Sequence, residues 1–275
     1  MSLTPIQPAN GHEKERVIVF DDVAIAFDDN VVLDGVSFHL RHGETKILLG
    51  VAGSGKSTIL KLALGLLKPD RGHIWVLGND VTEMQEEDLF ALRRRIGMVF
   101  QESALFDSLT VRENVAYRLL EEHVPAEECE RRVREALRFV ELEHTLEKFP
   151  SELSGGMRRR VAIARAIVTH PEALLYDSPT GGLDPVTSTT IIELIVKQRD
   201  VYHTSALMVT HRLQDAFTMA THYFDKSANQ MRPLGPNKVN MEATFILLRD
   251  GKIIFDGTTP ELAQSRDEYI REYIS

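Results

Sequence analysis

A glycine-rich run near residue 50 has the residue types and the spacing of a phosphate-binding loop. Residues 50–57 are Gly-Val-Ala-Gly-Ser-Gly-Lys-Ser and match the pattern G-x-x-x-x-G-K-[ST]. An apolar segment precedes the run and a helical pattern follows it, which is the context that the motif requires. The alternative is a glycine turn that merely begins a helix, but a chain of this length matches the bare pattern by chance only about once in a hundred.

The chemistry of a nucleoside triphosphate explains why these residue types are needed. Glycines at 50, 53 and 55 allow the backbone to curl so that its N–H groups point at phosphate oxygens, and the helix N-terminus adds partial positive charge. Lys56 supplies a cation for the β- and γ-phosphates, and the Ser57 hydroxyl is a ligand for Mg²⁺. The predicted ATP contacts of this loop are Gly50, Val51, Ala52, Gly53, Ser54, Gly55, Lys56, Ser57 and Thr58.

The elements that must position this loop are indicated by periodicity. Segments 17–27, 31–40 and 45–50 run or alternate in β-branched and apolar residues and predict strands, the third of which leads into the loop. Segment 58–68 repeats apolar residues at helical spacing, and a turn is expected at 70–72. The sequence therefore predicts a strand–loop–helix unit.

A helical segment and a second α/β segment follow. Residues 110–146 predict helices, because Thr110 and Glu113 have the spacing of a capping box and a later apolar stripe runs along a charged pattern. Farther on, the sequence predicts strands at 173–177 and 205–210, a helix at 188–198 and a closing hairpin at 245–257.

A second glycine motif distinguishes among the proteins that use such a phosphate loop. Leu153-Ser-Gly-Gly-Met157 resembles the LSGGQ signature of ABC ATPases, with Met157 in place of the usual glutamine. On its own, this run is equally explained as a serine–glycine cap of a helix. The resemblance implies that Ser154, Gly155 and Gly156 form a second anion site, which in this family closes over the γ-phosphate held by the opposite subunit.

Further motifs of the same family follow in the family's order. The resemblance implies that Phe27 stacks on adenine, that Gln101 contacts Mg²⁺ and the membrane partner, and that Asp177 is the carboxylate that holds Mg²⁺. Asp184 matches the D-loop, and His211 matches the switch histidine. Each residue alone has a plainer alternative as a core aromatic, a loop amide, a helix cap or a structural histidine. The implied catalytic residues are Gln101, Asp177, Ser178 and His211, and the implied Mg²⁺ ligands are Ser57, Gln101 and Asp177.

Two positions depart from the family pattern. Ser178 stands where the family has a glutamate that polarises the attacking water, and a serine hydroxyl of ordinary pKa does not accept a proton at neutral pH. Arg212 follows the switch histidine where aspartate is more frequent, so a changed local charge near the γ-phosphate is expected. The arginine triplets at 93–95 and 158–160 are interpreted as solvated helix faces and neighbours of anions rather than as nucleic-acid patches.

The resemblance implies an α/β fold of the P-loop NTPase type and of the ABC ATPase class. Its parts are a RecA-like core on a mixed sheet, an antiparallel β subdomain and an inserted helical lobe at about 102–168. A flexible leader is expected at 1–16, the ATPase domain at 17–258, an inserted polar surface loop at about 224–243 and a C-terminal helix at 259–275.

Composition limits the class of protein and its location. The chain is 43% hydrophobic and 27% charged, as globular proteins are, and its net charge of −9 argues against nucleic-acid binding. The single cysteine, Cys129, excludes a disulfide within the chain and favours a reducing compartment. No apolar run is long enough to span a bilayer, so the expected location is cytoplasmic, on the inner face of the cell membrane through a permease.

Several phrases resemble the ATPases of bacterial Mce/Mla-type lipid transporters, among them QESALFDSLTVRENVAY and YDSPTGGLDPVTS. This implies three partners: a second ATPase subunit in a homodimer, an integral membrane permease and a lipid-binding substrate protein. Apolar Leu105, Phe106 and Leu109 in a polar loop indicate the permease-docking surface. Two alternatives stay open, a transporter of amino acids or other small solutes and an ATP-binding module whose degenerate site makes it a slow or regulatory subunit.

Overall fold

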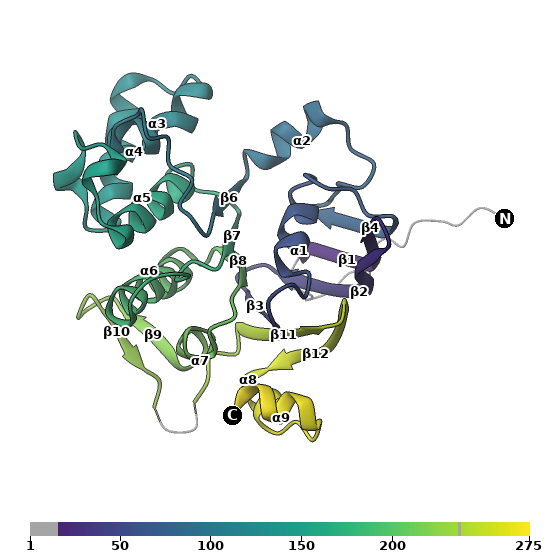
Figure 1. Cartoon of the computed structure of the whole chain (residues 1–275). Coiled ribbons are helices and arrows are strands. Elements are labelled where there is room, and N and C mark those ends of the chain that lie inside the picture. The colour runs from purple at the N-terminus through teal and green to yellow at the C-terminus, as the bar shows by residue number, and fades with distance from the viewer. Residues whose placement is uncertain (1–15, 236–237) are drawn as a thin grey trace, which may run out of the picture.

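The computed structural model describes residues 16–235 and 238–275. Figure 1 shows a central sheet with a helical lobe on one side, around α3 to α5, and with α1 and the strands β1, β2 and β4 on the other. The predicted leader at 1–16 lies outside the described residues except for Arg16, which begins the first strand.

The central sheet has six strands in the order β12-β11-β3-β8-β7-β6. All neighbouring pairs are parallel except β11 with β12, so the sheet is mixed, as the fold class predicted. The inner strands β3, β7 and β8 are almost fully buried, which is typical of parallel strands covered on both faces. The strands are β3 (Thr45–Leu49), β6 (Ile96–Val99), β7 (Ala173–Asp177), β8 (Ser205–Val209), β11 (Ala243–Arg249) and β12 (Lys252–Thr258).

A separate antiparallel sheet with the order β2-β1-β4-β5 confirms the predicted β subdomain. It consists of β1 (Arg16–Phe27), β2 (Asn30–Arg41), β4 (Arg71–Val76) and β5 (Asn79–Asp80). The turn expected at 70–72 is wrong, because Arg71 already pairs with Ala24 and begins β4.

Helix α1 (Lys56–Ala63) follows the glycine loop but ends five residues before the predicted end at 68. Gly65 adopts φ +62°, its N–H bonds the Leu62 carbonyl, and the Leu66 N–H bonds the Lys61 carbonyl. This pattern is the Schellman motif, so the glycine stops the helix although apolar residues continue beyond it. Helix α2 (Glu86–Arg93) lies between β5 and β6.

The helical lobe consists of α3 (Val111–Glu121), α4 (Ala126–Phe139) and α5 (Gly155–Ile167). The predicted capping box is present: the Thr110 N–H donates to Glu113 Oε2 at 2.7 Å, and the Glu113 N–H donates to Thr110 Oγ1 at 3.2 Å. Short 3₁₀ turns at Glu143–Thr145 and Pro150–Glu152 connect α4 to α5.

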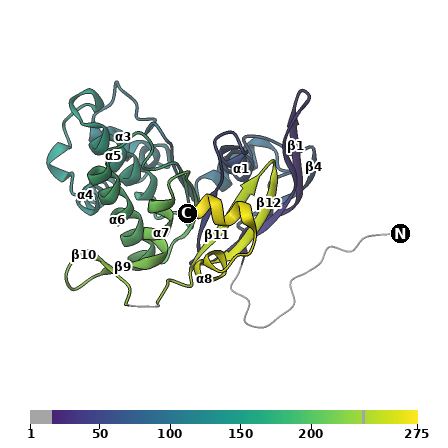
Figure 2. The ribbon, with the colours of Figure 1, turned by 60° about the horizontal axis from the view of Figure 1, so that its bottom comes forward.

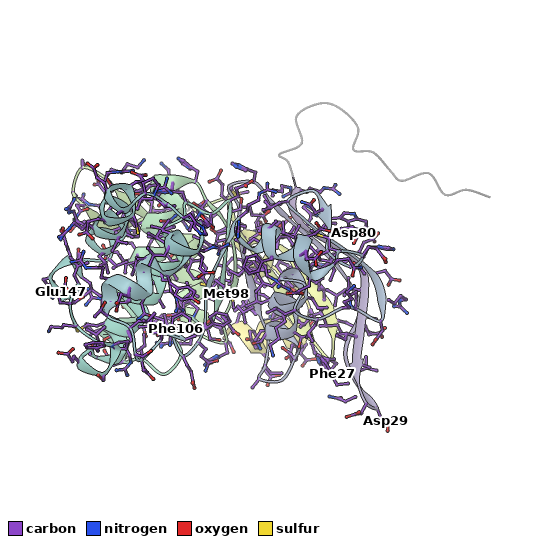
Figure 3. The ribbon with its side chains drawn as sticks, turned by 90° about the horizontal axis from the view of Figure 1, so that it is seen from above. Phe27, Asp29, Asp80, Met98, Phe106 and Glu147 are labelled. Atoms are coloured by element: carbon purple, nitrogen blue, oxygen red, sulfur yellow. The ribbon has the colours of Figure 1, made fainter. Side chains whose placement is uncertain are left out.

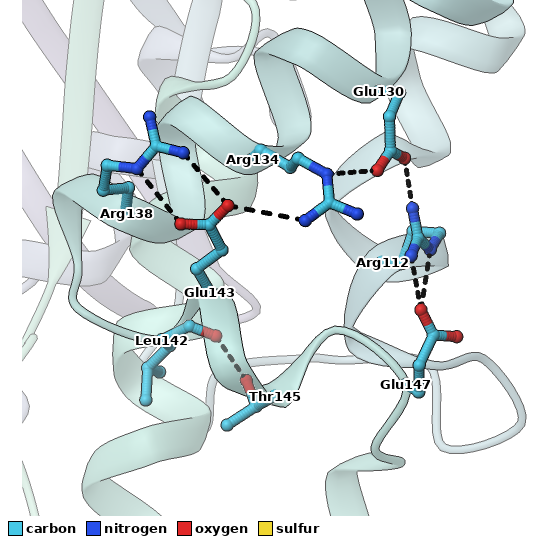
Figure 4. Close-up of polar contacts among 8 residues, drawn as sticks. All are labelled: Arg112, Glu130, Arg134, Arg138, Leu142, Glu143, Thr145 and Glu147. Atoms are coloured by element: carbon cyan, nitrogen blue, oxygen red, sulfur yellow. Dashed lines mark hydrogen bonds and ion pairs between the residues drawn. The ribbon is translucent and has the colours of Figure 1, made fainter.

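A chain of charged side chains joins the lobe's surface elements (Figure 4). Arg112 on α3 pairs with Glu130 on α4 and with Glu147, while Arg134 and Arg138 on α4 both pair with Glu143. Isolated exposed pairs contribute little, but a network that joins four segments restricts how they move relative to one another.

Helix α6 (Pro185–Tyr202) is longer than predicted at both ends, and α7 (Leu213–Thr221) follows β8. The surface loop expected at about 224–243 is wrong in its first half, because β9 (His222–Asp225) and β10 (Gln230–Pro233) form an antiparallel hairpin there. The hairpin rests on α6, where the Met231 N–H donates to Glu193 Oε1 at 2.7 Å and Phe224 is buried. The two strands are short, and the polar composition of the segment gave no sign of them in the sequence.

The single C-terminal helix expected at 259–275 is in fact two helices, α8 (Thr259–Ala263) and α9 (Glu268–Ile274). The break occurs where Asp267 caps α9 by accepting a hydrogen bond from the Ile270 N–H at 3.0 Å. No helix among residues 16–235 and 238–275 is long and apolar enough to cross a membrane.

Candidate active site

Four of the predicted motifs meet at one edge of the central sheet. The glycine loop follows β3, Gln101 follows β6, Asp177 ends β7 and His211 follows β8. These strands are parallel, and β3, β8, β7 and β6 are consecutive in the sheet, so their carboxyl ends lie side by side (Figure 1). Ligands of open α/β sheets bind at this edge.

The glycine loop has the backbone that its composition predicts. Gly50, Gly53 and Gly55 have φ values of +151°, +79° and +97°, which L-residues with side chains rarely adopt. Gly55 is the N-cap of α1 in the left-handed conformation, and a Cβ there would lie 2.8 Å from Leu33 Cδ2. The loop therefore curls tightly before α1. Because the N-cap residue is glycine, no N-cap side chain accepts hydrogen bonds from the N–H groups at the start of the helix.

Lys56 is a buried cation whose hydrogen bonds go to its own loop. Its Nζ donates to the carbonyl oxygens of Gly50 at 2.8 Å and Val51 at 2.6 Å and to Ser54 Oγ at 3.2 Å. Burial lowers the pKa of Lys56, and the nearby Asp177 carboxylate counteracts that shift. A cation held by neutral carbonyls at a helix N-terminus fits an anionic ligand such as a triphosphate.

Ser57 and Asp177 form the oxygen donor set expected for Mg²⁺. The Ser57 hydroxyl donates to Asp177 Oδ1 at 3.2 Å, although the two residues are 120 positions apart in the sequence. Two oxygen atoms this close together can bind the same metal ion. A hydroxyl and a carboxylate are hard oxygen ligands, so the donor set fits Mg²⁺. The Gln101 side chain is exposed and lies near Gly181, where a Cβ would be 3.4 Å from Gln101 Cγ.

Ser178 occupies a constrained position directly after Asp177. It is buried and adopts φ +45°, its N–H donates to the Val209 carbonyl at 2.9 Å, and its own carbonyl accepts from the Gly181 N–H at 2.9 Å. Its backbone therefore ties the end of β7 to β8, while the side chain offers a hydroxyl and no carboxylate.

Two arginines hold the segment that follows Ser178. Arg159 donates to the carbonyl oxygens of Phe100, Ser178 and Gly181 at 3.1, 3.3 and 3.4 Å. Arg212 donates to the carbonyls of Thr180 and Leu183 at 3.3 and 3.4 Å and to Ser188 Oγ at 2.8 Å. The segment 178–183 is thus fixed by Arg159 of α5 and by Arg212, which follows β8.

Arg159 corrects a sequence-based expectation, whereas the expectation of a changed charge around Arg212 stays a prediction. Arg159 is 4% exposed, so the triplet 158–160 is not a solvated helix face. The guanidinium of Arg212 is directed at the D-loop carbonyls and at Asp215, at 3.5 Å, so its charge is partly neutralised there. The triplet itself gave no signal that its middle member is buried, whereas Arg212 stood out as a departure from the family pattern.

Ser154 and Asp184 both begin helices that lie next to each other. Ser154 Oγ accepts from the Met157 N–H at 3.2 Å, and Asp184 Oδ1 accepts from the Thr187 N–H at 3.0 Å. The hydrogen bonds with Thr187 lower the pKa of Asp184. Gly156 permits close packing there, because a Cβ would lie 2.4 Å from Thr187 Cγ2.

The signature motif lies apart from the glycine loop of its own chain, and Phe27 lies at the tip of a hairpin. Ser154, Gly155 and Gly156 belong to the helical lobe, on the opposite side of the central sheet from α1 (Figure 1). Phe27 ends β1 at the tip of the β1–β2 hairpin and is 44% exposed (Figure 3). Its ring is accessible for stacking, and the role in adenine binding stays a prediction.

One protein-family model matches the central part of the chain. Residues 33–181 match the family model described as "ABC transporter". The dimeric ATP-binding cassette MJ0796, in a post-hydrolysis state bound to ADP and phosphate, superposes with a TM-score of 0.72 at 28% identity over 88% of this chain and 98% of that one.

Relatives with different names match most of the chain. Protein TRIGALACTOSYLDIACYLGLYCEROL 3, chloroplastic, of Arabidopsis thaliana is 37% identical over 95% of this chain and 74% of its own length. The intermembrane phospholipid transport system ATP-binding protein MlaF of Haemophilus influenzae is 30% identical over 94% of this chain and 90% of its own. The methionine import ATP-binding protein MetN of Bifidobacterium longum is 38% identical over 72% of this chain, which spans about half, 51%, of MetN.

Proposed function

The chain belongs to the ABC transporter family of ATPases, which bind ATP with Mg²⁺ and hydrolyse it, and from this premise we propose that it drives transport of a phospholipid or another lipid. The observation that supports the lipid class is the extent of one match: this chain covers 90% of the phospholipid-transport ATPase MlaF but 51% of the methionine-import ATPase MetN. Amino acids and other small solutes are the alternative class, because MetN is the more identical of the two over the shared part.

The strand-end cluster can bind and orient a magnesium triphosphate. Loop amides and Lys56 hold phosphate oxygens, and Ser57 with Asp177 holds the metal, which offsets the charge of the phosphates when bound. Gln101 and His211 follow β6 and β8, the strands on either side of β7, where an amide and an imidazole can orient a water for attack.

A second copy of the chain completes the site in this proposal. The Ser154 motif lies across the sheet from the glycine loop of its own chain, and it begins a helix of 13 residues whose N-terminus favours an anion. A head-to-tail pair places the Ser154 motif of one chain over the phosphates held by the other. The similar cassette MJ0796 is dimeric with ADP and phosphate bound, which supports a paired arrangement.

The substitution at 178 favours slow hydrolysis, and with it the second candidate function of an ATP-held regulatory subunit. Nothing in the Ser178 side chain accepts a proton from water at neutral pH, and its backbone is fixed by Val209 and Gly181. ATP binding is then intact while turnover is low.

The surface proposed for the membrane subunit is a rigid loop with exposed aromatics. Asn114 is fully buried and bonds both backbone groups of Phe106: its Oδ1 accepts from the N–H at 2.8 Å, and its Nδ2 donates to the carbonyl at 3.0 Å. Phe106 and Tyr117 are each 43% exposed and pack with ring centroids 4.8 Å apart. Leu105 and Leu109 are half-buried, and Leu105 packs against the core, so Phe106 is the residue that a partner would contact.

Phe106→Asp is expected to abolish assembly with the membrane subunit while leaving ATP affinity within about twofold, because a charge replaces an exposed aromatic anchor. Assembly is measured by affinity pull-down of the complex and ATP binding by equilibrium dialysis. Phe90→Asp is the matched control, since Phe90 on α2 is 54% exposed and outside this surface. Normal complex yield from Phe106→Asp would place the docking surface elsewhere.

The lipid class is tested on the native complex. After purification with its membrane subunit, bound molecules are extracted and identified by mass spectrometry. Phospholipid or another lipid at about one molecule per complex supports the proposal, and an amino acid or another small solute as the retained molecule replaces it with the alternative.

A further inference from the structure

Helix α9, at the end of the chain, reaches the first glycine of the phosphate loop. The Gly50 N–H donates to the Tyr273 hydroxyl oxygen at 3.1 Å, across 223 residues of sequence. Figure 1 shows the C-terminal helices α8 and α9 beside β12, and Figure 2 shows the C-terminus next to α7.

The position of Tyr273 is built into the fold by packing. Ile270 is 2% exposed within the core that includes Phe245 and Leu247 of β11, and Tyr269, Tyr273 and Ile274 pack against the same core. These four residues form one face of α9, which is the face a surface helix buries. Arg249, at the end of β11, lies over the Tyr269 ring with its Cζ atom 4.0 Å from the ring centroid. Helix α9 is therefore held both by its apolar contacts with the core and by this contact with Arg249.

Gly50 is closely packed on the side where a Cβ would stand. A Cβ at this residue would lie 2.5 Å from the Leu248 carbonyl oxygen and 2.7 Å from Ser54 Oγ. Its two polar groups point in different directions: the N–H donates to Tyr273, and the carbonyl accepts from Lys56 Nζ at 2.8 Å. A single glycine therefore connects the Tyr273 hydroxyl to the ammonium group that faces the phosphates.

We propose that Tyr273 is a positioning residue of the phosphate-binding loop, through which helix α9 sets the affinity for the phosphates of ATP. The proposal rests on the proposed function, since it concerns ATP at the same loop. With the hydroxyl present, the Gly50 N–H is satisfied inside the protein and the loop is held in one conformation. Without it, a buried N–H loses its acceptor, and loop conformations that expose Gly50 to water compete with the binding conformation.

The test compares two single-oxygen deletions on the same helix in the full chain. Tyr273→Phe keeps the ring and removes the acceptor, and Tyr269→Phe is the matched control because its ring, and not its hydroxyl, contacts Arg249. Affinity for Mg-ATP is measured by equilibrium dialysis, and hydrogen–deuterium exchange is measured on the peptide that contains Gly50. Calorimetry reports whether each variant is folded.

Tyr273→Phe is expected to weaken Mg-ATP binding about fivefold to tenfold and to speed exchange at Gly50 by at least about tenfold, while kcat at saturating ATP stays within about twofold. Tyr269→Phe is expected to change neither. Suppose that Tyr273→Phe binds Mg-ATP as tightly as the unmodified chain does, while Lys56→Ala does not bind it. Tyr273 is then only a core residue, and the proposal for Tyr273 fails while the proposed function stands. If the unmodified chain binds no Mg-ATP, the proposed function fails together with the proposal for Tyr273.

Discussion

Lys56→Ala is expected to lower the affinity for ATP by at least about 100-fold, because it removes a buried cation from the point where we propose that the β- and γ-phosphates bind. Each charge-assisted hydrogen bond contributes about 1.5–3 kcal/mol, and Lys56 has its donors directed into the loop. The loop amides remain, so weak residual binding is expected. Equilibrium dialysis with labelled ATP measures the change.

Lys61→Ala is the control for Lys56→Ala. Lys61 is an exposed lysine in the last turn of the same helix, so its removal changes the net charge equally without touching the loop. Its ATP affinity should stay within about twofold. Equal affinities for all three proteins would refute the assignment of residues 50–57 to phosphate binding.

Ser178→Glu is expected to raise the steady-state rate of phosphate release by at least about tenfold with little change in ATP affinity. A positioned general base contributes about 10² to 10⁴ in rate, and position 178 directly follows Asp177 at the end of β7. The expected gain in rate is below this range because a glutamate at φ +45° in a buried position is strained.

Ser178→Gln separates the carboxylate from the size of the side chain. It should be folded, bind ATP and show no gain in rate, since an amide does not accept a proton at neutral pH. If the unmodified chain already turns over rapidly and Ser178→Glu adds nothing, another residue supplies the base and the regulatory-subunit alternative loses its support.

The parts of the fold with strong local signals were predicted from the sequence. The β3–loop–α1 unit, the helical lobe with its Thr110–Glu113 capping box and the closing hairpin β11–β12 are all present, because periodicity and capping chemistry act over a few residues. The meeting of Ser57 with Asp177 was implied by the family resemblance, and the structure shows their contact directly.

Most errors arose where tertiary structure outweighs local pattern, and one arose because the apolar run at 58–68 was given more weight than the local stop signal of Gly65. The polar segment after β9 pairs as a hairpin because α6 offers it a surface, and α1 ends early because Gly65 adopts a left-handed conformation inside an apolar run. Arg159 is buried because carbonyls of two distant segments, one at Phe100 and one at 178–183, converge on it. The contact of Tyr273 with Gly50 depends on where the last helix packs, which no local pattern encodes.

The central claim is that ATP is held between the glycine loop of one chain and the Ser154 motif of another, and mixing two inactive variants tests it most directly. Lys56→Ala removes the cation that we propose contacts the phosphates. Ser154→Asp keeps a helix cap, since aspartate is a good N-cap, but places a negative charge against the γ-phosphate. In a mixed pair, one of the two sites combines the intact Lys56 of one chain with the intact Ser154 of the other.

Molecular mass is measured by light scattering with saturating Mg-ATP, for each variant alone and for the equimolar mixture. The account predicts monomers for each variant alone, a dimer population in the mixture with ATP bound at one site per dimer, and monomers throughout when ADP replaces ATP. A mixture that stays monomeric while the unmodified chain dimerises with ATP, or a Lys56→Ala chain that dimerises by itself, would contradict it.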